Sequence, residues 1–232
     1  MLIESHTGIR GIFGKDLDLS VVRKYALAFY NFLKEKQEDK ERPLTIVIGS
    51  DTRNSSEEIK REFIKTLSSL NSKVLDLGYN TTPIVQHAVK TFSADGGIIV
   101  TASHNPKEYN GFKFLSNEGS QLIKEEMKEL ITLSKTTEEK FFQGDFRNVK
   151  NVHKEAIDSY IDFLINFIGQ ESIKKIKEFN PTFLLDPNGG AACFVIKKLF
   201  KKLGIKILLK NNNPGIFNRE IEPNESSLNY LK

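Results

Sequence analysis

Residues 96–106 combine a short apolar run with an abruptly polar end. Residues 98–100 are a continuous stretch of isoleucine and valine, which is typical of a strand buried on both faces of a parallel sheet. The polar residues that follow lie at the carboxyl end of this strand, where open α/β sheets place their ligands. Pro106 has no N–H and disfavours helical angles at the residue before it, so this loop does not extend into a following helix. We expect a reactive hydroxyl on a shaped loop, with Ser103 as the candidate.

Helical and strand-like patterns alternate along the first hundred residues. They predict a helix at 19–36, a strand at 44–49, a helix from about 56 to 70, a strand at 73–78, a helix at about 83–92 and a strand at 98–100. We expect Ser55 or Ser56 to cap the second helix, with Glu58 completing a capping box. This alternation predicts an α/β fold with a mixed, mainly parallel sheet and helices on both faces.

The later part of the chain repeats this pattern on a smaller scale. A short strand at 112–115 and a helix at about 121–133 are followed by residues 134–152, which lack sustained periodicity. We therefore predict one domain over residues 1–145 and a second, incomplete α/β domain of similar type over residues 146–232. Its expected elements are helices at about 153–168 and 172–179, a strand at 182–185, a helix reaching about 203 and a strand at 205–209. The turn at 186–192 has glycines that suit phosphate at a helix N-terminus, but it matches neither the dinucleotide fingerprint nor the P-loop.

Composition narrows the classes of partner. The 34 basic and 30 acidic residues give a net charge of +4 and are spread along the chain, which favours a solvated surface over a nucleic-acid patch. The sequence contains no run of about 18 apolar residues, so we expect no membrane span. The first residues do not resemble a secretory signal. The single cysteine, Cys193, excludes an internal disulfide framework and suits a reducing compartment, so we expect a cytoplasmic protein.

Two further stretches carry candidate site residues. Residues 7–14 hold three glycines beside Arg10, which suits either close approach to a ligand or a flexible turn with a surface arginine. Asp51 and Arg53 follow the strand at 44–49. They form either an ion pair that fixes their loop or a pair of ligand contacts.

The chemistry of Ser103 admits few mechanisms. Adjacent residues in an extended loop point to opposite sides, so we expect His104 to be badly placed to deprotonate Ser103, and no G-x-S-x-G elbow is present. The scattered histidines and the lone cysteine do not predict a metal site made by protein alone. A phosphorylated serine is the better hypothesis. It needs cations, which Arg10, Lys113 and His104 supply if their loops converge, and a divalent metal would complete the charge balance.

Four motifs resemble those of the α-D-phosphohexomutases: the phosphoglucomutases, phosphomannomutases and phosphoglucosamine mutases. The strongest is Thr101-Ala-Ser-His-Asn-Pro106 followed by Tyr109-Asn-Gly-Phe-Lys113, which is similar to the active-site loop of that family. The others are Thr7-Gly-Ile-Arg-Gly11, Gly49-Ser-Asp-Thr-Arg53 and Asp186-Pro-Asn-Gly-Gly-Ala191. They occur in the family's order and span the whole chain.

The resemblance implies a mechanism. Ser103 would be carried as phosphoserine, donate its phosphoryl group to a hexose phosphate, and recover the other phosphoryl group of the bisphosphorylated sugar. Arg10 and Lys113 would act as charge stabilisers or proton relays, and His104 would assist near the same hydroxyl. Mg²⁺ would be held through the phosphate on Ser103. Residues expected to contact substrate or support the loop are Thr101, Asn105, Asn110, Asp51 and Arg53.

The chain also departs from the family pattern. The family's metal loop, resembling D-G-D-A-D-R, and its third and fourth domains are not found in this sequence; Glu222-Pro223-Asn224 resembles the segment that leads toward the metal loop. We therefore expect the N-terminal part of a phosphohexomutase that turns over little sugar phosphate alone, with the C-terminal domains as a possible separate partner chain. The alternative is a non-catalytic domain that keeps the fold for binding or assembly. The motifs do not identify which hexose is used.

Overall fold

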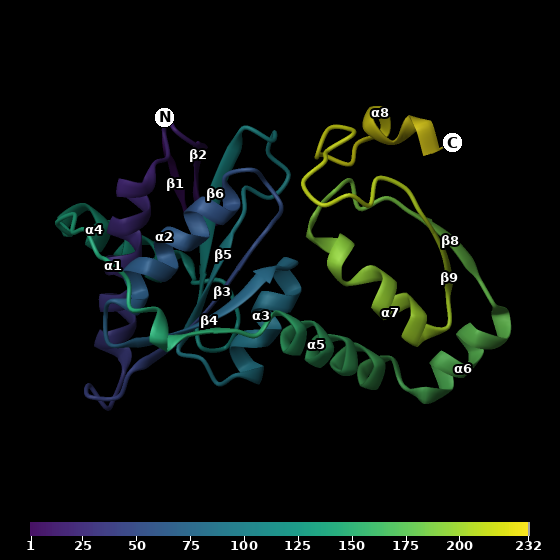
Figure 1. Cartoon of the computed structure of the whole chain (residues 1–232), viewed down its shortest axis with the longest axis horizontal. Coiled ribbons are helices and arrows are strands. Elements are labelled where there is room, and N and C mark those ends of the chain that lie inside the picture. Colours follow the sequence, from purple (N-terminus) through teal and green to yellow (C-terminus); the bar gives the residue numbers. More distant parts are fainter. Residues whose placement is uncertain (232) are drawn as a thin grey trace.

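The computed structural model describes residues 1–231 and contains two α/β units, joined through α5 and α6 (Figure 1). The elements are, in chain order, β1 (Ile3–Ser5), β2 (Gly8–Ile12), α1 (Leu19–Lys36), β3 (Leu44–Ser50), α2 (Ser56–Ser68), β4 (Ser72–Tyr79), α3 (Thr82–Thr91), β5 (Gly96–Val100), β6 (Tyr109–Leu115), α4 (Lys124–Thr136), η1 (Phe146–Asn148), β7 (Val149–Asn151), α5 (His153–Ile168), α6 (Gln170–Phe179), β8 (Thr182–Leu185), η2 (Ala191–Phe194), α7 (Ile196–Leu203), β9 (Lys206–Leu209), α8 (Glu225–Leu228) and η3 (Asn229–Leu231).

The first unit is built on a seven-stranded sheet in the order β1-β2-β6-β5-β3-β4-β7. β3 pairs in parallel with β4 and β5, and β4 pairs in parallel with β7. β1, β2 and β6 add antiparallel pairings on the other side. The predicted α/β fold with a mixed sheet is confirmed. Its antiparallel part is larger than the alternating pattern suggested, because the chain returns from the loop after β5 directly into β6.

Helices cover both faces of this sheet. α1, α2 and α4 enclose one hydrophobic cluster, which includes Phe63, Phe112 and Ile98, whereas α3 and α5 enclose a second cluster that includes Ile99. Neighbouring residues of β5 thus belong to opposite cores, and every residue of β5 is buried. A strand between two helical layers has no polar face, which explains its continuous apolar sequence.

Residues 3–12 form a β-hairpin, and the expectation of a flexible N-terminal turn is wrong. β2 lies along β6, with Arg10 opposite Gly111 and Ile9 opposite Phe112. The glycines serve close approach: a Cβ on Gly111 would lie 2.1 Å from the carbonyl oxygen of Ile9. Because β6 lies about a hundred residues further on, the local sequence gave no sign of this pairing.

The capping box expected at the start of α2 does not form. Ser55 takes the N-cap position with helical angles and its side chain accepts no capping hydrogen bond. The hydroxyl of Ser56 instead donates to the carboxylate of Asp51 at 2.5 Å. The side chain that looked like a helix cap is thus used to fix the loop after β3.

The second unit pairs β8 and β9 in parallel, with α7 on one face (Figure 1). Phe183 packs edge-on against Phe200 of that helix, whereas Leu184 and Leu208 are 51% and 61% exposed. The expected division of the chain after residue 145 stays a prediction. The structure adds that β7, which follows that point, pairs with β4 of the first sheet, and that α5 packs on α3.

Candidate active site

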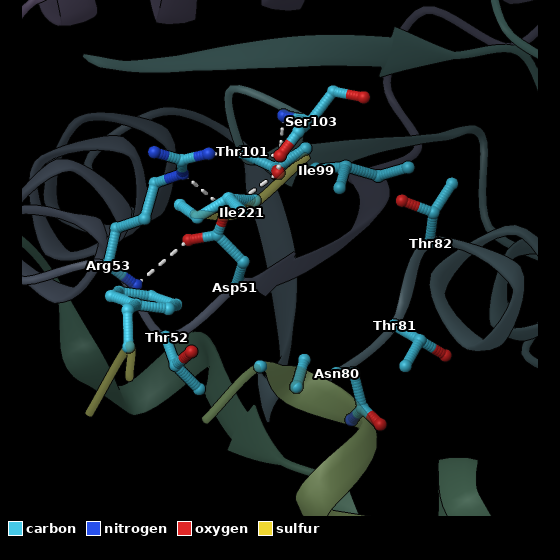
Figure 2. Close-up of a pocket in the computed structure, with 13 residues that line it drawn as sticks. Asp51, Thr52, Arg53, Asn80, Thr81, Thr82, Ile99, Thr101, Ser103 and Ile221 are labelled. Atoms are coloured by element: carbon cyan, nitrogen blue, oxygen red, sulfur yellow. Dashed lines mark hydrogen bonds and ion pairs between the residues drawn. The ribbon is translucent and has the colours of Figure 1, made fainter. Parts of the chain in front are cut away.

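Three loops at the carboxyl ends of β3, β4 and β5 surround a cavity of about 200 Å³ (Figure 2). They contribute residues 51–53, residues 80–82, and the hydroxyl-bearing residues Thr101 and Ser103. The loop of residues 101–109, called the serine loop below, follows β5 as the apolar run predicted. Parallel strands bring these loops to one edge of the sheet, which is where α/β folds bind ligands.

Arg53 fixes the backbone of the serine loop. Its side chain is 2% exposed, and its Nε donates to Asp51 Oδ2 at 3.1 Å. The four remaining guanidinium N–H groups donate to backbone carbonyl oxygens of the serine loop. These acceptors are Ser103 at 2.9 Å, Asn105 at 2.8 Å, Pro106 at 2.7 Å and Tyr109 at 3.0 Å. All five donors of the guanidinium are used. The predicted Asp51–Arg53 ion pair is present, and it serves to hold this arginine under the loop.

Asp51 connects the loop after β3 to the residues before Ser103. Its Oδ2 accepts the hydroxyl hydrogen of Thr101 at 2.7 Å, and the Thr101 oxygen in turn accepts from the backbone N–H of Ser103 at 3.0 Å (Figure 2). Its Oδ1 accepts from Ser56 and from the backbone N–H of Arg53. The carboxylate therefore accepts four hydrogen bonds, one for each of its lone-pair sites.

Asn110 joins the same network from β6. It is fully buried, and its Nδ2 donates to the hydroxyls of Ser55 at 2.8 Å and Ser56 at 3.0 Å. Its Oδ1 accepts the backbone N–H of Gly111, whose own carbonyl accepts from Thr101 N at 2.8 Å. Asn110 therefore ties the end of the serine loop to the start of α2.

Asn105 has a different place in the site: its backbone carbonyl oxygen accepts a hydrogen bond from Arg53.

Ser103 is exposed and has a left-handed backbone with φ of +58°. This conformation is uncommon for a residue with a side chain, and such residues cluster at functional sites. The Oγ lies 3.4 Å from Nδ1 of His104. The expectation that His104 points away from Ser103 is therefore wrong, because side chains alternate only along an extended chain.

Arg10 and Lys113 lie together on the hairpin side of the sheet. Arg10 is opposite Gly111, so Lys113 is its diagonal neighbour on the same face. Burial, together with the charge of Arg10, lowers the pKa of Lys113. The Nε of Arg10 is buried and has no hydrogen-bond partner among the described residues. These two cations do not line the cavity that Ser103 borders.

The structure adds site residues that the sequence did not indicate. Phe217 and Ile221 of the second unit line the same cavity as Ser103, and Glu222 Oε2 lies 3.8 Å from His104 Nε2. Thr52 donates from its hydroxyl to the carbonyl of Gly189 at 2.7 Å. No local pattern marks such residues, because each contact joins segments more than a hundred positions apart.

Residues 1–231 lack two other functional features. No group of three or more His, Cys, Asp or Glu side chains in this range is arranged to hold a metal ion. Nor does this range contain a helix whose length and apolar content would let it cross a bilayer.

Comparison with known proteins places these features in a family. The family model described as phosphoglucomutase/phosphomannomutase, alpha/beta/alpha domain I, matches residues 2–141. A phosphoglucomutase/phosphomannomutase of Thermococcus kodakarensis is 39% identical over 95% of this chain, and a phosphoglucosamine/phosphogalactosamine mutase of Sulfurisphaera tokodaii is 30% identical over 95%. The crystal structure of a phosphoglucomutase/phosphomannomutase family protein from Burkholderia thailandensis superimposes with a TM-score of 0.76 at 25% identity, covering 100% of this chain and 49% of that one.

The chain therefore belongs to the phosphoglucomutase/phosphomannomutase family, as the resemblance of its motifs predicted. It covers 47% of the length of both relatives and so spans about half of each.

Proposed function

We propose that this chain carries the phosphoserine-bearing half of a phosphohexomutase, with Ser103 as the phosphoryl carrier. The observation that supports this most directly is the exposed Ser103 hydroxyl on a loop whose backbone Arg53 fixes through four carbonyl oxygens. Phosphoryl transfer depends mainly on positioning and charge stabilisation, and a fixed loop supplies the positioning.

The proposed substrate is a hexose phosphate. In one half-reaction the Oγ–P bond of phosphorylated Ser103 breaks as a P–O bond forms to a sugar hydroxyl. The proton of that hydroxyl is relayed through a nearby base to the Ser103 oxygen. In the other half-reaction the second phosphoryl group of the bisphosphorylated sugar returns to Ser103, and the proton travels the opposite way.

The three basic side chains have distinct proposed roles. His104 lies within 3.4 Å of the Ser103 oxygen through its Nδ1 and is placed to carry that proton. Lys113 gives up its proton more readily than an exposed lysine because its pKa is lowered, so it suits a proton relay. Arg10 brings a guanidinium group, which suits a phosphoryl oxygen, and its buried Nε has no hydrogen-bond partner among residues 1–231.

Mg²⁺ is the cofactor that the family resemblance implies. The residues described here do not fit such an ion by themselves, because they provide no suitable ligand group and Asp51 already accepts four hydrogen bonds. The proposed metal would need ligands besides the phosphate on Ser103.

The remaining proposals concern the complete protein. We propose domains over residues 1–145 and 146–232, a cytoplasmic location that suits the single cysteine, and low turnover by the 232 residues alone. We propose that full activity also needs the C-terminal domains that the family resemblance implies, as part of the same polypeptide or as a separate chain.

Intact-mass spectrometry after incubation with glucose 1,6-bisphosphate tests the carrier role. We expect a gain of about 80 Da on the wild-type chain and none on Ser103→Ala. Ser93→Ala is the matched control, since Ser93 also has a left-handed backbone, with φ of +49°, and lies outside the serine loop. No gain on the wild-type chain would contradict the proposal and favour a non-catalytic binding module. The same gain on Ser103→Ala would also contradict it, because another residue would then carry the phosphoryl group.

A further inference from the structure

The turn that begins at Asp186 has no part in the proposed chemistry, although its glycines suggested a phosphate loop. Protein backbone fills the space over Gly189: a Cβ there would lie 2.4 Å from the carbonyl oxygen of Ile216 and 2.8 Å from that of Asn213. Gly189 has φ of +66°. Gly189 allows residues 213–222, called the covering segment below, to pass closely over the turn.

Asn188 holds the covering segment by its backbone. Its Oδ1 accepts from the N–H groups of Asn218 at 2.9 Å and Arg219 at 3.2 Å. Its Nδ2 donates to the carbonyl oxygens of Arg219 at 3.1 Å and Glu220 at 3.4 Å. The side chain amide thus uses both lone pairs and both N–H groups. Asn188 is 5% exposed, so these bonds are sheltered from water.

Asp186 binds both Asn188 and the covering segment. Its carboxylate accepts the backbone N–H of Asn188 at 2.7 Å and the Nε of Arg219 at 3.0 Å, and its side chain is 3% exposed. Asn188 therefore acts in the same way as Arg53: a buried polar side chain holds a neighbouring segment by hydrogen bonds to the backbone of that segment.

The covering segment lies against the serine loop. Its residues 217–222 and residues 104–108 of the serine loop line a groove of about 630 Å³. Phe217 and Ile221 also border the smaller cavity next to Ser103, and Figure 2 labels Ile221 among the residues that line it. From the opposite side, Thr52 bonds the turn itself through the carbonyl of Gly189.

We propose that Asn188 is a positioning residue for the serine loop. By holding the covering segment, it places Phe217 and Ile221 beside Ser103 and Glu222 beside His104. The environment of the phosphoryl carrier is then set jointly by both units, with Arg53 holding the loop from the first unit and Asn188 holding its neighbour from the second. The phosphorylation rate rests on the proposed role of Ser103, whereas hydrogen exchange and the His104 resonances do not.

The test compares three variants of the full chain. Asn188→Gly removes the amide and tolerates the left-handed backbone, because Asn188 has φ of +46°. Asn188→Asp keeps the two bonds accepted by Oδ1 and loses the two donated by Nδ2. Asn180→Gly is the matched control: Asn180 has φ of +51° at the end of α6, outside the site.

The readouts are amide hydrogen exchange, the ¹⁵N resonances of the His104 ring and the rate of mass gain from glucose 1,6-bisphosphate. In Asn188→Gly we expect exchange at Asn218 and Arg219 to be about tenfold faster, His104 resonances to shift and the phosphorylation rate to fall about tenfold. Asn188→Asp should give an intermediate result, and Asn180→Gly should match the wild type.

His104 resonances and a phosphorylation rate equal to the wild type, in whichever Asn188 variant is folded, would overturn the proposal. The turn would then stabilise only its own unit. If the wild-type chain takes no phosphoryl group, the carrier role fails, and the His104 resonances alone still decide whether Asn188 positions the serine loop.

Discussion

Replacing Arg53 by lysine tests whether one guanidinium holds the serine loop. Lysine keeps the charge but offers three N–H donors on a single atom, so at least two of the five acceptors of Arg53 lose their partner. A hydrogen bond to a charged group contributes about 1.5 kcal/mol at the low end, so two lost bonds lower the free energy of unfolding by about 3 kcal/mol. The free energy of unfolding falls by about 3 kcal/mol per M of urea for a chain of this size. The urea midpoint should therefore fall by about 1 M.

Urea unfolding followed by circular dichroism measures this midpoint, and hydrogen exchange at residues 103–109 shows whether the loss is centred on the loop. Arg147→Lys is the matched control, because Arg147 also pairs with an aspartate two residues away but its side chain is 88% exposed. Its midpoint should not change. A midpoint for Arg53→Lys within about 0.2 M of the wild type, with unchanged loop exchange, would refute the reasoning.

Two further predictions concern packing and pH. Gly111→Ala should lower the free energy of unfolding by about 3 kcal/mol in the same urea assay, because the new methyl group meets the Ile9 carbonyl 2.1 Å away; a loss below about 0.5 kcal/mol would show that the hairpin yields easily. Burial lowers the pKa of His87 from its ordinary value of 6.5, so the unfolded chain binds a proton more readily between that value and the lowered pKa. Stability should therefore fall as the pH drops through this window, and His87→Gln should lack that part of the fall; urea midpoints from about pH 7 to about pH 5 check it, and equal slopes in both proteins would contradict it.

The sequence predicted those elements whose signal is local. The helix at 19–36 matches α1, because its apolar face repeats regularly. The strand predicted at 98–100 lies within β5, whose residues are all buried; β5 itself begins two residues earlier, at Gly96. The N-terminal hairpin was missed, since its strand pairs with β6 far along the chain. Local chemistry likewise indicated the Asp51–Arg53 pair, whereas the four carbonyl oxygens that Arg53 binds carry no sequence signal.

The error over His104 has a different physical origin. The expectation assumed an extended backbone, and the left-handed angle at Ser103 turns the two side chains toward each other. Such an angle is set by the bonds that Arg53 and Thr101 make to the loop, and so depends on residues brought together only by the fold. The positions of Phe217, Ile221 and Asn188 near the serine loop could not be predicted either, because they too depend on contacts between distant parts of the chain.

The way Arg53 grips the serine loop has a consequence for how such a site can diverge. Every amino acid has a carbonyl oxygen, so a loop fixed through its carbonyls keeps its shape when its side chains change. Side chains at positions such as Asn105 and Tyr109 are then free to vary during evolution at constant loop geometry. A lineage can adapt them to a new ligand without rebuilding the fold, provided that the arginine beneath the loop is retained.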